Sequence, residues 1–188
     1  MQMRSDRGQD IVDANGLTAR TSELTNRGQL TGRRTRALAF VIRSLERSHP
    51  GNVGPIKALA RLRGLRALSM SGPLRTLLLG RAERGLRHAL RVSPSDADTH
   101  YYLGSALASR HRCDVDAVRH LEAAVGLTGE ADPRPLLALA QLEARSGDPD
   151  NAETLLDAAN SALQEDDPRT PARLARIAAV RKELEDAA

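Results

Sequence analysis

The pattern of apolar and polar positions separates an irregular start from a helical remainder in this 188-residue chain. Residues 1–32 are polar and have no sustained helical period, so we expect a disordered segment at the start of a basic front half. Residues 33–55 predict an amphipathic helix over 33–48 and a linker, because apolar residues recur at i, i+3, i+4 and i+7 between arginines. These apolar positions are Leu38, Val41, Ile42 and Leu45.

A second helix is predicted over residues 56–70, where leucines are spaced by three. That spacing drifts around a helix of 3.6 residues per turn, so this helix should be buried on more than one side. Gly72 and Pro73 end it. Pro73 suits the first turn of the following helix, because a backbone donor is not needed there.

A repeat begins after residue 74. Three segments carry Ala, a Leu four positions on and another Ala three positions further, and the segments follow one another at an offset of 35 residues. This spacing marks one helical face, where small alanines let a second helix approach closely. Residues 56–188 are therefore interpreted as one helical repeat domain. The repeated positions are Ala82, Leu86, Ala89, Ala117, Leu121, Ala124, Ala152, Leu156 and Ala159.

Partner helices are predicted between these segments. Leu103-Gly104 and Leu139-Ala140 correspond at an offset of 36, with the extra residue in the turn 110–114. Gly147 suits the left-handed position after a helix, and Asp148-Pro149 suits the start of the next one. A charged helix from Pro171 to about Glu185 is expected to cap the array, since the last apolar face of a solenoid needs a cover.

The composition supports closely packed helices. Ala (29) and Leu (28) are abundant, Trp is absent and there is one Phe, which disfavours a β-sandwich. No apolar stretch approaches the roughly 20 residues of a membrane span, and the start lacks the apolar core of a secretory signal. The single cysteine, Cys113, excludes an internal disulfide framework and favours a reducing cytoplasm.

The repeat resembles the tetratricopeptide repeat (TPR), a helix–turn–helix unit of about 34 residues. The match is strongest in the third repeat, and the second repeat and the second helix of the first also carry it. The resemblance implies an all-α, antiparallel helix-pair solenoid of about three repeats with a C-terminal capping helix. The matching residues of the third repeat are Leu139, Ala140, Gly147, Ala152, Leu156 and Ala159.

The resemblance also implies that a peptide or helix of a partner protein binds in a concave groove lined by the first helix of each repeat. The Lys/Asn set with which some family members hold the C-terminal carboxylate of chaperones is absent, which disfavours that function. Tyr101 offers a flat contact surface, and Arg134 with Arg145 could pair with carboxylates. Alternatively, Tyr101 and Tyr102 only fill an Ala-rich interface. The implied groove residues are Asp98, Tyr101, Ser105, Ala108, Ser109, Arg134, Leu137, Gln141, Ala144 and Arg145.

The sequence contains no recognisable motif for catalysis or cofactor binding, so we expect no enzyme, no cofactor and no metal. His111, Cys113 and His120 with Asp116 match none of the common zinc spacings. Residues 80–85 do not form a phosphate-binding loop.

The charge is unevenly distributed and leaves two alternatives to a protein-binding adaptor. Residues 1–91 hold 18 Lys and Arg against 6 Asp and Glu, whereas residues 92–188 hold 10 against 18. The first alternative is that residues 20–91 bind nucleic acid or an anionic surface. The second is that copies of the chain associate head to tail. The basic and acidic halves of the chain could also simply attract each other. The predicted basic patch comprises Arg33, Arg34, Arg36, Arg43, Arg61, Arg63 and Arg66.

Overall fold

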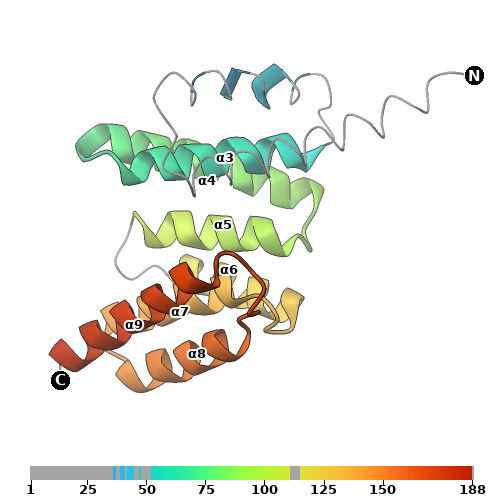
Figure 1. The fold of residues 1–188 in the computed structure, drawn as a ribbon. Coiled ribbons are helices and arrows are strands. Elements are labelled where there is room, and N and C mark those ends of the chain that lie inside the picture. Colours follow the sequence, from blue (N-terminus) through green and yellow to red (C-terminus); the bar gives the residue numbers. More distant parts are fainter. Residues whose placement is uncertain are drawn as a thin grey trace, which may run out of the picture. The chain divides into compact units, whose positions relative to one another are not determined.

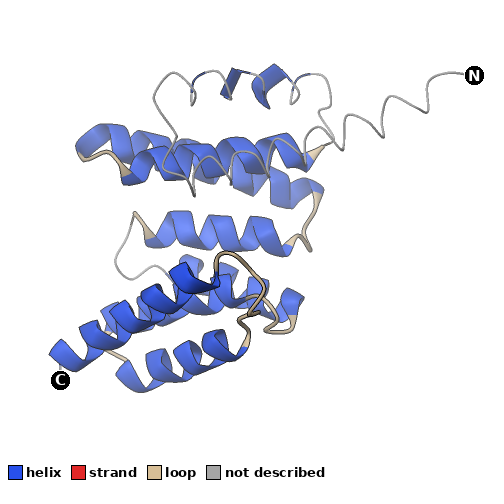
Figure 2. Cartoon of the chain, viewed as in Figure 1, coloured by secondary structure: helices blue, strands red, loops and turns tan. Residues whose placement is uncertain are grey.

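The computed structural model describes residues 52–110 and 115–187, together with isolated helical positions between residues 36 and 47. Within these residues the chain is helical and contains no strand, which confirms the predicted all-α class (Figures 1 and 2). The predictions for residues 1–32, and for Arg33, Arg34, His111 and Cys113, lie outside the described residues. Internal contacts divide the chain into the units Met1–Pro94 and Ser95–Ala188, which are described separately.

The first unit contains α3 (Val53–Leu68) and α4 (Gly72–Val92). Helix α3 begins three residues before the predicted start, because the Asn52 side chain accepts a hydrogen bond from the Gly54 N–H at 2.9 Å and caps the helix. Pro55 is tolerated in that first turn, where its missing N–H leaves no hydrogen bond unmade. The predicted role of Pro73 at the start of α4 is confirmed.

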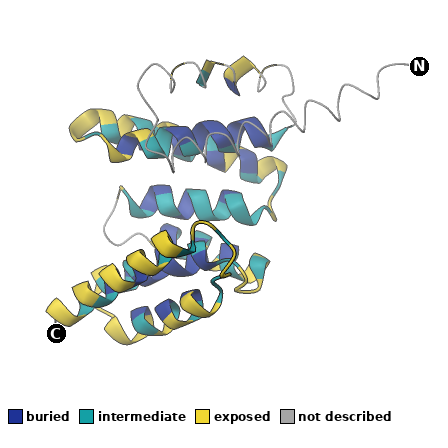
Figure 3. Cartoon of the chain, viewed as in Figure 1, coloured by how far each residue is buried: buried dark blue, intermediate teal, exposed yellow. Residues whose placement is uncertain are grey.

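Helices α3 and α4 form an antiparallel pair. The Arg63 Nη1 donates to the Arg81 carbonyl at 3.1 Å near the shared turn, while Ile56 packs beside Gly85 further along. Helix α3 is buried over much of its circumference, as its leucine spacing predicted (Figure 3). Ile42 is fully buried against Ala58, Leu59 and Leu62, as expected for the apolar face of the 33–48 helix; the other three apolar positions of that face lie outside the described residues.

The second unit contains α5 (Ala97–Ala108), α6 (Val115–Thr128), α7 (Pro133–Ser146), α8 (Pro149–Ser161) and α9 (Thr170–Ala187). Helices α5 and α6 pack as one pair, and α7 and α8 as the next. Helix α7 contacts α5 and α6, and α9 contacts α7 and α8 in the same way. Helix α9 therefore occupies the place of the first helix of a further repeat and covers the end of the array.

The repeated Ala–Leu–Ala positions form the interfaces within the helix pairs. All nine side chains are at most 1% exposed. Gly104 on α5 explains how close this packing is, because a Cβ atom there would lie 2.6 Å from the Leu121 Cγ and 3.0 Å from the Ala117 carbonyl oxygen. Only a residue without a side chain fits between α5 and α6 at this point.

The turns are stabilised at the predicted residues. Gly147 has φ of 89°, in the left-handed region, and its N–H donates to the Glu143 carbonyl. The Asp148 side chain accepts from the Asn151 N–H at 3.1 Å and caps α8. Helix α4 has 21 residues, whereas α6 has 14 and α8 has 13. The start of α4 at Gly72-Pro73 therefore lies earlier in the chain than a strict 35-residue offset from the starts of α6 and α8 would place it.

Candidate functional site

Three of the predicted groove residues lie together where α5 and α7 begin. The Arg134 Nη2 on α7 donates to the Asp98 Oδ1 on α5 at 2.7 Å. The Arg134 guanidinium also lies over the Tyr101 ring, with its Cζ 5.0 Å from the ring centroid, which is within the range of a cation–π contact. We call the side of α5 and α7 that carries Asp98, Tyr101, Ser105, Arg134, Gln141 and Arg145 the first-helix face.

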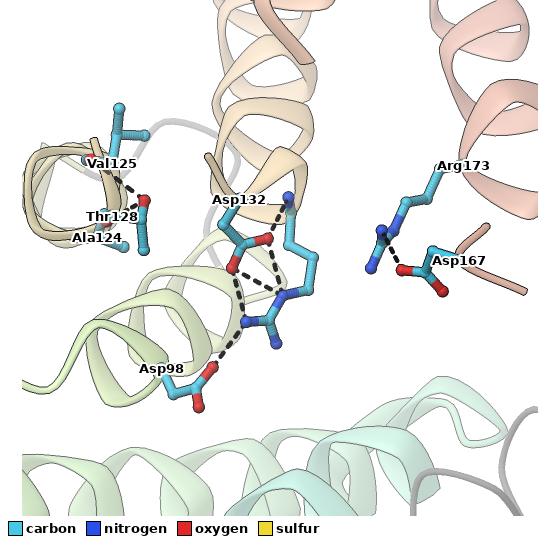
Figure 4. Close-up of polar contacts among 8 residues, drawn as sticks. Asp98, Ala124, Val125, Thr128, Asp132, Asp167 and Arg173 are labelled. Atoms are coloured by element: carbon cyan, nitrogen blue, oxygen red, sulfur yellow. Dashed lines mark hydrogen bonds and ion pairs between the residues drawn. The ribbon is translucent and has the colours of Figure 1, made fainter. Parts of the chain in front are cut away.

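Asp132 precedes α7 and fixes Arg134 in place. One carboxylate oxygen of Asp132 accepts from the Arg134 N–H at 2.9 Å and so caps the helix. The same carboxylate accepts from the Arg134 side chain through Nε at 2.9 and 3.0 Å and through Nη2 at 2.6 Å. Asp98 in the first turn of α5 and Asp132 just before α7, both labelled in Figure 4, therefore bind the same guanidinium.

The charges of this cluster stabilise one another. Partial burial alone would raise the pKa of Asp132, but hydrogen bonds and the positive charge of Arg134 outweigh burial and hold this pKa below its ordinary value. Burial likewise opposes the charged form of Arg134, yet Asp132 and Asp98 raise its pKa. Arg134 is therefore charged but already neutralised by its own chain. The pairing of Arg134 with carboxylates of a partner stays a prediction, and in this structure its guanidinium binds Asp98 and Asp132 and lies over the Tyr101 ring.

Tyr101 and Tyr102 form a second contact on α5. Their ring centroids are 5.1 Å apart with a tilt of 52°, and both side chains are half-buried. Tyr101 therefore packs against Tyr102 and Arg134 and still retains exposed surface.

Leu137 is a correction to the predicted groove residues. It is only 2% exposed and belongs to a core cluster with Leu136, Ile177 and Val180, because α9 packs against this part of α7. A side chain with so little accessible surface cannot contact a partner without local unfolding. Sequence spacing placed Leu137 on the correct side of α7 but could not show that α9 covers it.

The remaining groove residues surround two local contacts. The Ser109 Oγ donates to the Ser105 carbonyl at 2.8 Å and closes the end of α5. On α7, the Arg145 Nε donates to the Gln141 carbonyl at 2.9 Å. The Arg176 Nη2 of α9 donates to the Gln141 side-chain oxygen. Arg176 was not among the groove residues predicted from the sequence. A signal for it existed, because Pro171 lies in the first turn of α9 as Pro133 lies in the first turn of α7, which indicates equivalent helices.

The three arginines of the predicted basic patch on α3 do not all share one side of the helix. Arg63 and Arg66 are three positions apart and lie near each other on the helix surface, whereas Arg61 lies roughly 140–200° around the helix from them. Arg63 is directed toward α4 by its hydrogen bond to the Arg81 carbonyl. Arg36 and Arg43 are exposed in the isolated helical positions.

Other site types find little support in the described part of the chain. No group of three or more His, Cys, Asp or Glu residues is arranged there to hold a metal ion. His120 instead pairs with His100, with their Nδ1 atoms 3.0 Å apart between α6 and α5. None of the described helices is both long and apolar enough to cross a membrane.

Comparison with known proteins identifies the fold. No protein-family model and no curated protein matches the sequence. Among solved structures, a thermophilic TPR protein from Thermus thermophilus superposes with a TM-score of 0.71 and 21% sequence identity. The match covers 90% of this chain and 81% of that protein. The chain therefore has a TPR fold, as the 35-residue repeat predicted.

Proposed function

We propose that this chain is a non-catalytic adaptor that binds a peptide or helix of a partner protein on the first-helix face. The observation that carries the proposal is the Tyr101–Arg134 contact, in which an aromatic ring is held in one orientation and kept partly accessible. Tyrosine and arginine are common anchors of protein interfaces, since both offer large contact area together with polar groups.

The cluster around Tyr101 is also organised before any partner arrives. Asp98 and Asp132 fix the Arg134 guanidinium, which in turn fixes the ring. A side chain that is already ordered loses less conformational entropy on binding, so it contributes more of its contact energy to affinity. A TPR fold is consistent with a protein partner, whereas the sequence contains no catalytic motif that would favour a reaction.

Nucleic-acid binding is less well supported than protein binding. Arg61 lies on the opposite side of α3 from Arg63 and Arg66, so these three arginines do not form one basic stripe along that helix for a phosphate backbone. Tyr101 and Tyr102 lie in the acidic half of the chain, where stacking on bases would be opposed by charge.

A peptide-display selection tests the proposal. A library of random peptides is panned against the full chain and against the variants Ser105→Trp and Thr154→Trp. Ser105 lies on the first-helix face of α5, whereas Thr154 is exposed on α8. We expect the peptides enriched by the wild-type chain to lose binding to Ser105→Trp and to keep binding to Thr154→Trp.

Peptides that bind Ser105→Trp as well as they bind the wild-type chain would contradict the proposal. Circular dichroism and thermal unfolding of both variants establish that the added indole leaves the fold intact. Tyr101→Ala provides a second variant of the same face, and it is expected to weaken the same peptides because the anchor ring is removed.

A further inference from the structure

The arginines of the second unit fall into two groups according to their partners. Four of the eight described ones, Arg119, Arg134, Arg173 and Arg181, make ion pairs with carboxylates of the described residues. Arg134 binds Asp98 and Asp132, Arg173 binds Asp167 at 2.8 Å, and Arg181 binds Glu153 and Asp157 at 2.7 and 2.6 Å.

Arg145 and Arg176 differ, because neither makes an ion pair with any carboxylate of the described residues. Both instead donate a hydrogen bond to Gln141. Arg145 donates to its backbone carbonyl from the next turn of α7, and Arg176 donates to its side-chain oxygen from α9. Both arginines are exposed, and Gln141 is half-buried between them.

This arrangement brings two positive charges to one neutral residue. Each guanidinium has five N–H donors, and Gln141 accepts one hydrogen bond from each, so several donors of both groups still face solvent. Like charges held close together repel, and an approaching anion relieves that repulsion while it gains two charge-assisted hydrogen-bond partners.

Arg145 and Arg176 lie in the acidic part of the chain. Residues 92–188 carry 18 Asp and Glu against 10 Lys and Arg, yet no carboxylate of the described residues neutralises these two arginines. The surrounding negative charge weakens non-specific binding of polyanions such as nucleic acid. A carboxylate overcomes this repulsion only where it reaches the two guanidinium groups directly, so the ligand should present few carboxylates, at defined positions.

We propose that the partner segment on the first-helix face is acidic, and that side-chain carboxylates of that segment bind Arg145 and Arg176. Gln141 is the positioning residue, because its side chain holds the Arg176 guanidinium and its backbone carbonyl accepts from Arg145. This inference rests on the proposed function, which supplies the face, and it adds the chemistry of the partner. Arg134 takes no part in binding these carboxylates.

The display selection is extended to test this inference. The library is panned against the full chain, the double variant Arg145→Gln/Arg176→Gln and the control Lys182→Gln. Lys182 is an exposed cation of the same helix as Arg176, so its replacement changes the charge without touching the pair. We expect Asp and Glu to be enriched about twofold over the input library on the wild-type chain and on Lys182→Gln, but not on the double variant.

Synthetic peptides then separate the contributions. The strongest acidic peptide, amidated at its C-terminus, is compared with a version in which Gln replaces every Glu and Asn every Asp. We expect this neutral version to bind at least about tenfold more weakly, and each single arginine variant to weaken the acidic peptide about threefold. Gln141→Leu retains both charges and the backbone carbonyl that Arg145 uses, but it removes the side-chain acceptor of Arg176, so it should still weaken binding by releasing Arg176.

Either of two results with peptides would overturn the inference and leave the proposed function standing. One is a set of peptides that depends on Ser105 and Tyr101 but shows no enrichment in Asp and Glu. The other is an acidic peptide whose affinity is the same for the wild-type chain and the double variant. Equal competition by a single-stranded oligonucleotide would overturn it as well, by showing a general polyanion site. Peptides insensitive to Ser105→Trp would instead reject the proposed function itself.

Discussion

The Arg134 guanidinium binds the Asp98 carboxylate at 2.7 Å, and the two residues occupy the same position in successive first helices, 36 residues apart. Each is the second residue of its helix. The repeat thus places an acid and a base at equivalent positions of adjacent units. The ion pair joins α5 to α7 beside Tyr101, so it contributes both to the packing of the repeats and to the shape of the first-helix face.

Replacing Arg134 by Met should lower the free energy of unfolding by about 1 kcal/mol. The change leaves Asp98 and Asp132 without their shared cation, and the effect is moderate because the Arg134 side chain is 30% exposed. Urea denaturation measures the change. Arg119→Met is the control, since its pair with Asp116 is more exposed and should contribute less than about 0.5 kcal/mol. Equal losses of unfolding free energy for both variants would show that the Arg134 cluster stabilises the chain no more than an exposed ion pair does.

Asp132 should contribute to a loss of stability in acid. Its pKa is lower in the folded chain than its ordinary value, so its contribution is fully present above the unfolded pKa of about 3.9. That contribution disappears as the pH falls through the lower folded value. Asp132→Asn should be less stable than the wild-type chain near pH 7 and should lose less stability between about pH 5 and pH 2.

Thermal unfolding at a series of pH values checks this dependence. Asp186→Asn serves as the control, because Asp186 is exposed near the end of α9 and should leave the wild-type profile unchanged. Profiles of wild type and Asp132→Asn that run parallel from neutral to acidic pH would refute the assigned role of Asp132.

Gly104→Ala should destabilise the chain, although alanine is the better helix former. The added methyl group would meet the Leu121 Cγ at 2.6 Å and a backbone oxygen at 3.0 Å, and such overpacking costs roughly 1–3 kcal/mol. Gly126→Ala on α6 is the matched control, since no atom lies within 4 Å of its added Cβ. It should stabilise the chain by about 0.5–1 kcal/mol. Chemical denaturation of both variants should therefore give shifts of opposite sign.

Leu156→Ala should cost about 2–5 kcal/mol of unfolding free energy. Leu156 is fully buried in the cluster shared by α7, α8 and α9, so its loss leaves a cavity there. Leu174→Ala removes the same atoms from a side chain that is 45% exposed on α9, and it should cost less than about 1 kcal/mol. Similar denaturation midpoints for the two variants would show that the cluster does not carry the stability assigned to it.

The sequence by itself determined the repeat and its packing. Ala and Leu at 35-residue intervals identified the buried face of each second helix, and Gly147 marked a turn. These features are local, because a helical period, a cap or a small residue has much the same consequence wherever the helix packs. The TPR resemblance followed from them and was confirmed in the fold.

Only the tertiary structure decided which of the predicted groove residues are buried and which are exposed. Leu137 and Gln141 lie on the same side of α7, yet α9 buries the first and supplies Arg176 to the second. Nothing in the sequence distinguished Arg134 from Arg145, but two carboxylates neutralise the first, whereas no carboxylate of the described residues forms an ion pair with the second. Such differences depend on contacts between side chains of different helices, far apart in the sequence, and helix periodicity carries no information about which of them meet.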